Sequence, residues 1–189
     1  MFQAFERRVL VPIRKYVLPM IRLDKETTKE AVCLVFEKVN MGGEKLDAFE
    51  LVTAMFAATG LLNLREDWYG GGKDTGREKR LHKIDVLRGI DRSDFLRAVS
   101  LAHTYETRQK AIQAGRTGKD VPPVSCAHAA LLNVPAEAYV AWRERVSSGF
   151  ESAARFLHGR GLYWWKDVPY PSRITARAAL YALRDTWTP

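Results

Sequence analysis

Two groups of residues have types and spacings that could act on a phosphate-bearing ligand. The first is an Asn-x-Gly-Gly sequence formed by Asn40, Gly42 and Gly43. Glycines in a turn between two helices leave backbone N–H groups open to a phosphate, and Asp47 stands nearby at the start of the next predicted helix. A helix-ending turn also needs residues that tolerate a positive φ for steric reasons alone. The pattern therefore indicates either the contour of a nucleotide or phosphate loop or an ordinary turn.

The second group is a run of cations in the middle of the chain. Residues 71 to 120 hold 12 Lys and Arg against 7 Asp and Glu, and this segment supplies most of the net charge of +8. Clustered cations neutralise phosphates and release counterions, and Trp68 and Tyr69 at the edge of the run could stack on bases. A solvated loop without a partner would have the same composition. The nucleic-acid-binding candidates are Lys73, Arg77, Lys79, Arg80, Lys83 and Arg88, and Arg92 ends the run.

Other catalytic patterns are not supported by the sequence. Glu37 and Glu50 could be read as paired carboxylates, but a solvated helix face explains Glu37 and a capping box with Asp47 explains Glu50. The chain contains no phosphate loop of the Gly-x-x-x-x-Gly-Lys type and no Gly-x-Ser-x-Gly elbow. Its cysteines, Cys33 and Cys126, are far apart and have no metal-ligand spacing. We therefore assign no catalytic residue and no metal ligand.

Most elements that would position these residues are predicted to be helices. Thr27 and Glu30 have capping-box spacing, and the apolar residues that follow predict a helix over about 28–39. Asp47 begins a second helix, which Gly60 ends. Similar spacing predicts helices over about 94–113, from Pro135 to about residue 157, and over about 172–186. Only residues 16–23 have the character of a strand.

The order of these elements carries a family resemblance. The run Tyr16 to Leu23 precedes Phe36-Glu-Lys-Val-Asn-Met-Gly-Gly43 and then Leu46-Asp-Ala-Phe-Glu-Leu-Val-Thr-Ala54. In this order and spacing, the segments resemble the GmrSD-type restriction endonuclease N-terminal domain family. Three later segments also resemble the helical half of that family: residues 94–101, 122–126 and 150–158. The likeness covers most of the chain.

The resemblance implies a fold and a role. It implies a mainly α chain, namely the helical bundle-like part of an α/β ParB/sulfiredoxin-like domain with one short N-terminal strand. The 189 residues would form a single partial domain. Residues 1–60 would supply the strand and helix-turn-helix segment of the ParB-like core, 61–92 a flexible basic loop, and 93–189 the helical half. Intact relatives cut foreign or modified DNA and hydrolyse nucleotides, which implies a nucleotide and a divalent metal as their cofactors.

The chain departs from the family at its catalytic signature. No Asp-Gly pair occurs in the 189 residues, so the Asp-Gly-Gln-Arg motif is missing and no cofactor is expected in this chain. We expect a partial or degenerate member of the restriction family that is inactive alone. One alternative is a non-enzymatic nucleic-acid-binding module. Another is a helical interaction subunit that completes a separately encoded catalytic half, so DNA and a partner polypeptide are both expected as partners.

Composition indicates where this protein acts. No run approaches the roughly 20 apolar residues that a membrane span needs. The first ten residues include Glu6, Arg7 and Arg8, so they do not have the apolar core of a signal peptide. We therefore expect a cytoplasmic protein without a membrane partner.

Overall fold

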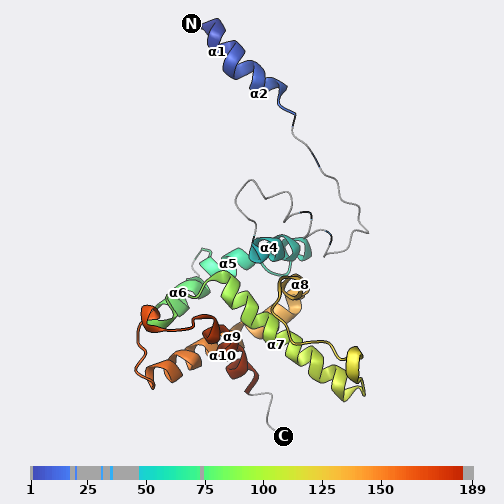
Figure 1. Ribbon diagram of the computed structural model, residues 1–189, viewed down its shortest axis with the longest axis vertical. Helices are drawn as coiled ribbons and strands as arrows, with labels where there is room; N and C mark the ends of the chain where they lie inside the picture. Colours follow the sequence, from blue (N-terminus) through green and yellow to red (C-terminus); the bar gives the residue numbers. More distant parts are fainter. Residues whose placement is uncertain are drawn as a thin grey trace.

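The regular elements of the described chain are all helices. A computed structural model describes residues 2–17, 20, 31, 35, 47–72 and 75–184, and no strand occurs within these ranges (Figure 1). The prediction of a mainly helical fold is confirmed. The predicted strand over 16–23 falls mostly outside the described residues, and Tyr16, Val17 and Met20 belong to no strand. Most of the predicted helix over 28–39 also lies outside the described ranges.

A helical stretch that we did not predict occupies the N-terminus. It consists of α1 (Phe2–Phe5), a π-helical turn (Glu6–Leu10) and α2 (Val11–Lys15). Phe5, Val9 and Ile13 recur at four-residue spacing, which is the helical signal that the sequence offered. All three side chains are exposed, at 52%, 37% and 67% respectively. Pro12 lies in the first turn of α2, directly after the π-helical turn, and its missing N–H removes one donor from the backbone hydrogen bonds of this continuous helical stretch.

Helix α4 (Ala48–Thr59) has the ends that the sequence predicted. The Asp47 carboxylate accepts a hydrogen bond from the Glu50 backbone N–H at 3.0 Å, which caps the helix. Gly60 follows with a φ of 66°, a left-handed conformation that glycine adopts without steric cost. The Glu50 side chain contacts other partners, since its Oε1 lies 3.1 Å from Arg65 and 2.9 Å from Arg92. Ion pairs with Arg65 and Arg92, and not the capping box that the sequence predicted, therefore explain the position of the Glu50 side chain.

The prediction of a flexible basic loop over 61–92 is wrong for the described residues of that segment. It contains α5 (Leu64–Tyr69), α6 (Gly76–His82) and the 3-10 turn η3 (Asp85–Leu87). Five apolar side chains of these elements are at most 1% exposed: Leu64, Trp68, Leu81, Val86 and Leu87. Each helix is too short to show a repeating apolar face, and the intervening glycines mask the pattern. Burial of these side chains, each contributing roughly 1.5–3 kcal/mol, holds the segment in place.

The long helices of the second half follow the predicted positions. They are α7 (Arg92–Gln113), α9 (Ala136–His158) and α10 (Ser172–Leu183), with the short α8 (His128–Leu132) and the 3-10 turns η4 (Gly118–Asp120) and η5 (Trp165–Asp167) between them. Asp91 caps α7 through a reciprocal capping box with Asp94.

The core joins these helices through a cluster of aromatic rings. Phe95 on α7 lies 5.5 Å from Trp68, 6.2 Å from Tyr139 and 6.0 Å from Phe150, measured between ring centroids. Phe56 on α4 meets Tyr139 edge-on at 5.7 Å. Aromatic pairs in such geometries add roughly 0.5–1.5 kcal/mol each to the burial of their area. The cluster therefore fixes α4, α5, α7 and α9 relative to one another.

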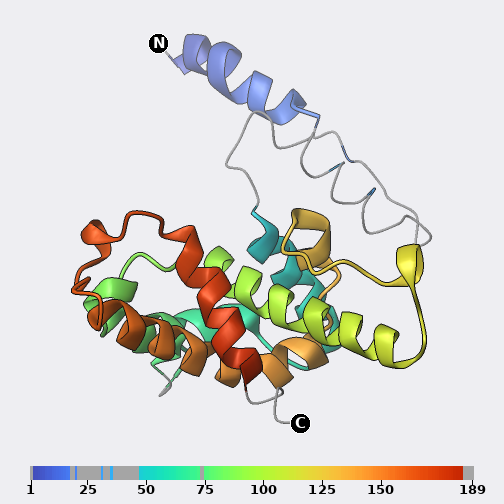
Figure 2. The same cartoon turned by 60° about the horizontal axis from the view of Figure 1, so that its bottom comes forward.

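Helix α10 crosses α9 at a very close approach. Figure 2 shows α10 lying across α7 and α9. A Cβ added at Gly149 on α9 would clash with the backbone carbonyl of Ala178 on α10. Gly149 thus permits backbone contact between the two helices. This crossing positions the start of α10 beside the end of α9, where the candidate site lies.

Candidate nucleic-acid interface

Four of the residues singled out from the sequence lie outside the described ranges. They are Asn40, Gly42, Gly43 and Lys73. The expected phosphate loop therefore stays a prediction. The remaining candidates from the basic run, Arg77, Lys79, Arg80, Lys83 and Arg88, are all described.

Arg77 lies inside the protein and is fully engaged there. Its side chain is 8% exposed, and its Nε donates to Asp67 Oδ2 at 2.6 Å. It also donates to Glu144 Oε1 at 2.6 Å and to Ser147 Oγ at 2.9 Å. The other oxygen of Asp67 accepts from Arg143 at 2.6 Å. Arg77 is therefore a structural residue that ties α5 and α6 to α9.

The electrostatics of this cluster favour its charged state. Burial alone would lower the pKa of Arg77, but hydrogen bonds to Asp67 and Glu144 outweigh burial and raise this pKa above its ordinary value. The hydrogen bond from Arg77 lowers the pKa of Glu144. Burial is the main cause that raises the pKa of Tyr139 well above its ordinary value, and the charge of Asp67 is the second. The Tyr139 hydroxyl donates a hydrogen bond to Asp67 at 2.8 Å. The cluster is a neutralising network without a free cation.

Two more arginines of the basic run have carboxylate partners. Arg80 lies 2.9 Å from Glu151 and 3.0 Å from Glu144. Arg92 lies 3.0 Å from Asp47 and donates to the Tyr69 hydroxyl at 2.9 Å. These contacts neutralise the charges that would otherwise attract a phosphate.

Three candidates of the basic run are exposed. Lys79 and Lys83 are exposed on and just after α6, and Arg88 is exposed after η3. Arg88 lies 2.8 Å from Asp85, but both side chains are accessible, so water and salt weaken this pair. Lys79, Lys83 and Arg88 remain candidates for phosphate contacts.

A second group of cations, which the sequence analysis did not single out, lies where α9 ends and α10 begins. The guanidinium of Arg177 lies 3.7 Å from the centroid of the Phe156 ring, and that of Arg160 lies 5.2 Å from the same ring. Arg173 lies over Tyr170 at 4.4 Å. Stacking on a ring uses the face of a guanidinium and leaves its N–H groups free at the edge. The three arginines are therefore held in place with donors available to a ligand.

A small pocket lies among these side chains. It has a volume of about 160 Å³ and is partly open. Its apolar walls include Leu157, Leu162 and Ile174, and Arg173 and Arg177 also line it. The pocket combines an apolar interior with positive charge, which suits a flat ring that carries an anionic group.

Exposed aromatic rings accompany these cations. Tyr163, Trp164 and Tyr170 are 54%, 51% and 57% exposed. Tyr163 stacks on His158, with ring centroids 5.3 Å apart. We call the whole set the basic–aromatic surface, and its members are Arg160, Tyr163, Trp164, Lys166, Tyr170, Arg173 and Arg177.

The charge of this surface is unopposed within the described chain. Residues 152–184 contain six Lys and Arg and a single carboxylate, Asp167. In the described ranges, none of the cations of the basic–aromatic surface forms a salt bridge. Over residues 121–189 as a whole, acidic residues such as Glu144 and Glu151 dilute the excess of cations. Those two carboxylates pair with Arg77 and Arg80, so the local run with a single acidic residue is the better signal.

The basic–aromatic surface adjoins the exposed cations of the basic run. Trp165 packs on Gly89, where a Cβ would collide with the indole ring. Figures 1 and 2 both show the red-orange segment around η5 beside the green end of α6. Arg88 and Lys166 are each the sequence neighbour of a contacting residue. The backbone segments that carry the two groups of cations therefore lie side by side.

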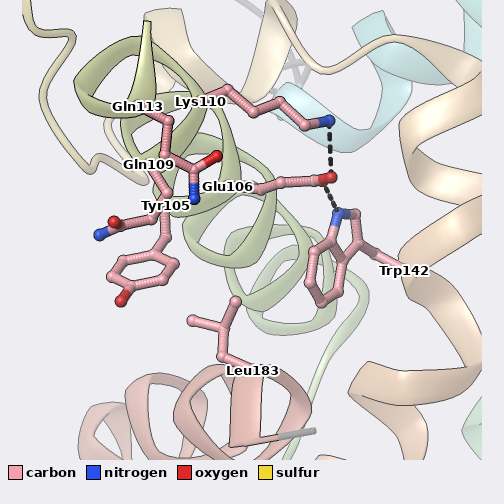
Figure 3. Close-up of a pocket in the computed structure, with 7 residues that line it drawn as sticks. All are labelled: Tyr105, Glu106, Gln109, Lys110, Gln113, Trp142 and Leu183. Atoms are coloured by element: carbon pink, nitrogen blue, oxygen red, sulfur yellow. Dashed lines mark hydrogen bonds and ion pairs between the residues drawn. The ribbon is translucent and has the colours of Figure 1, made fainter. Parts of the chain in front are cut away.

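A larger cavity, of about 690 Å³, lies between α7, α9 and α10 (Figure 3). Its central carboxylate, Glu106, accepts from Trp142 Nε1 at 3.1 Å and lies 2.7 Å from Lys110. The hydrogen bond from Lys110 lowers the pKa of Glu106. Glu106 is thus an ionised, engaged group and not a general acid. We find no feature of this cavity that selects a ligand.

The described part of the chain offers no metal cluster and no membrane span. Within those residues, no three His, Cys, Asp or Glu side chains come together in a way that could hold a metal ion. No helix among them combines the length and the apolar character needed to cross a bilayer. No family model, curated protein or solved structure matches the chain.

Proposed function

We propose that the chain is a nucleic-acid-binding helical module that has no catalytic activity alone. In this proposal it is a partial member of the nucleotide-dependent DNA restriction family that its sequence resembles. Its N-terminal segment would belong to a ParB-like α/β core, and Asn40, Gly42 and Gly43 would contour a phosphate loop there. The proposal includes a cytoplasmic location, because foreign DNA is met there.

The observation that supports this proposal most strongly is the state of Arg160, Arg173 and Arg177. Each guanidinium lies over an aromatic ring, at 5.2, 4.4 and 3.7 Å from the ring centroid respectively, and forms no salt bridge in the described chain. Arg77 and Arg80, by contrast, are neutralised by carboxylates. Arginines without a carboxylate partner have N–H donors free for an anion, and the planar fork of a guanidinium matches the oxygens of a phosphate as it does those of a carboxylate. Lys79, Lys83 and Arg88 would extend the phosphate contacts.

The test is salt-dependent binding of a fluorescently labelled 20-nucleotide DNA, followed by anisotropy. If about four phosphates are neutralised, the affinity should fall roughly 50-fold between 50 and 200 mM salt. The triple variant Arg160→Gln/Arg173→Gln/Arg177→Gln should bind at least tenfold more weakly than the native chain and show a shallower salt dependence.

A matched control removes the same charge elsewhere. The triple variant Arg65→Gln/Arg97→Gln/Arg116→Gln changes three exposed arginines outside the basic–aromatic surface. It should bind DNA within about twofold of the native chain at equal salt, apart from the long-range effect of net charge. Equal losses in both triple variants, or no loss in either, would overturn the proposed site.

The absence of catalysis is tested separately. The purified chain should hydrolyse ATP and GTP no faster than a boiled sample does, with magnesium present. Turnover above that background would overturn this half of the proposal, whatever the DNA-binding result.

A further inference from the structure

The basic–aromatic surface carries three large exposed aromatic rings. Tyr163, Trp164 and Tyr170 are each more than half exposed, and they lie within eight residues of one another. Large exposed aromatic side chains gathered among cations are typical of surfaces that stack on bases. The faces of bases are covered by their neighbours in a duplex and become accessible only when the strand is unpaired.

The site differs from the elements that commonly read a duplex. The major groove accepts a whole helix or a two-stranded ribbon. Here the cations and rings come from the end of α9, the start of α10 and the turn η5 between them, and not from one helix face or a ribbon. The pocket beside Arg173 and Arg177 has about 160 Å³, which suits one base and is too small for a base pair.

The arginines supply the matching phosphate contacts. Phe156 lies under Arg160 and Arg177, and Tyr170 lies under Arg173, and two of these cations, Arg173 and Arg177, line the pocket. A base that enters the pocket would bring its own phosphate toward Arg173 and Arg177. Neighbouring bases would then reach the exposed rings of Tyr163 and Trp164.

We propose that the basic–aromatic surface binds single-stranded nucleic acid, with unpaired bases stacked on Tyr163, Trp164 and Tyr170 and one base in the pocket between α9 and α10. This inference rests on the proposed function, because it names the ligand class of the same site. The inference adds a preference for single strands over duplexes. Charge alone would not give this preference, since cations attract duplexes and single strands alike.

The experiment compares two labelled probes, a 20-nucleotide oligothymidine and a 20-base-pair duplex, with the full chain at one salt concentration. We expect the single strand to bind at least tenfold more tightly. The variants Tyr163→Leu, Trp164→Leu and Tyr170→Leu should each weaken single-strand binding by roughly fivefold to a hundredfold, the range for loss of one stacked base. Duplex binding should change less than twofold.

Two controls keep the result specific. Tyr16→Leu makes the same change at a ring that is 71% exposed and lies far from the surface in sequence, so it should bind like the native chain. Thermal unfolding should be unchanged in the three surface variants, because their rings are mostly exposed. Quenching of tryptophan fluorescence by the oligothymidine should diminish in the Trp164→Leu variant.

The outcomes separate the inference from the proposed function. Equal binding of both probes, unaffected by the leucine variants but weakened by the arginine variants, would overturn the single-strand preference and leave DNA binding in place. Binding of neither probe would overturn both. Binding to vesicles of anionic phospholipid without binding to either probe would also overturn both and assign the surface to a membrane.

Discussion

Arg77 Nε lies 2.6 Å from Asp67 Oδ2, and each of the two side chains is only 8% exposed. Asp67 also accepts from Arg143 and Tyr139, so one carboxylate joins α5, α6 and α9. Of the cations in the basic run, Arg77 therefore stabilises the fold, whereas Lys79, Lys83 and Arg88 are exposed, as are Arg160 and Arg173 near the ends of α9 and α10. This division leads to predictions for stability and for binding.

Replacing Asp67 with asparagine should destabilise the fold strongly. The Asp67→Asn variant leaves the buried Arg77 without its main countercharge, and breaking a buried pair from one side costs about 3–5 kcal/mol. Urea unfolding followed by circular dichroism measures the change. Asp120→Asn is the control, because Asp120 is exposed in η4 and should change the free energy of unfolding by less than about 0.5 kcal/mol. Equal stabilities of the two variants would contradict the role of the network.

Alanine at Gly149 should destabilise the crossing of α9 and α10. Within an isolated helix, glycine to alanine is favourable by up to about 1 kcal/mol. Here the added Cβ meets the carbonyl of Ala178, so the helices must separate at a cost of roughly 1–3 kcal/mol. Gly159→Ala provides the contrast, because its Cβ would make only ordinary contacts. A stabilised Gly149→Ala variant would show that the two helices are not in backbone contact.

His103 should make the protein less stable in mild acid. Burial lowers the pKa of His103, with Glu106 acting to raise it and Lys110 to lower it. The folded state therefore favours the neutral ring of His103. The contribution of the neutral ring to the stability of the fold is complete above the unfolded pKa of about 6.5. This contribution is lost as the pH falls below that value and through the lower pKa that His103 has in the folded state. Thermal midpoints between pH 7.5 and 5.5 measure the effect.

The His103→Asn variant serves as the control for that titration. It removes the ionisable ring, so its midpoint should depend less steeply on pH over the same range than that of the native chain. Parallel curves for the two proteins would assign the pH dependence to other groups.

Lysine at position 177 should separate charge from stacking. The Arg177→Lys variant retains the positive charge, so the slope of log affinity against log salt should stay within about 0.3 of the native slope. It loses the planar guanidinium that lies 3.7 Å from the Phe156 ring, so its affinity for DNA should fall several-fold. Arg177→Gln should instead reduce the slope by about 0.7–0.9.

The exposed residue Arg97 supplies the matched comparison. Arg97→Lys changes an arginine paired with Asp94 on α7 and should alter neither the slope nor the affinity. An Arg177→Lys variant that binds DNA as tightly as the native chain would show that the stacked geometry does not matter.

Local signals in the sequence determined much of the helical framework. Asp47 and Gly60 specify the ends of α4, because capping and left-handed backbone depend on adjacent residues only. The apolar repeats of α7, α9 and α10 extend over enough turns to be read directly. The helices α5 and α6 were missed because two turns or fewer give no repeat, and what holds them is the burial of Leu64, Trp68 and Leu81.

The tertiary structure alone decided which cations face a ligand. In the sequence, Arg77 and Arg160 are both cations in polar, glycine-containing segments, and only the scarcity of acidic residues around Arg160 sets them apart. Arg77 is neutralised by Glu144, 67 residues further along the chain, once α9 packs beside α6. Arg160 instead comes to lie over Phe156 with no carboxylate within reach in the described chain. Coulomb interactions depend on distance in space, so the availability of a charge follows from packing and not from its position in the sequence.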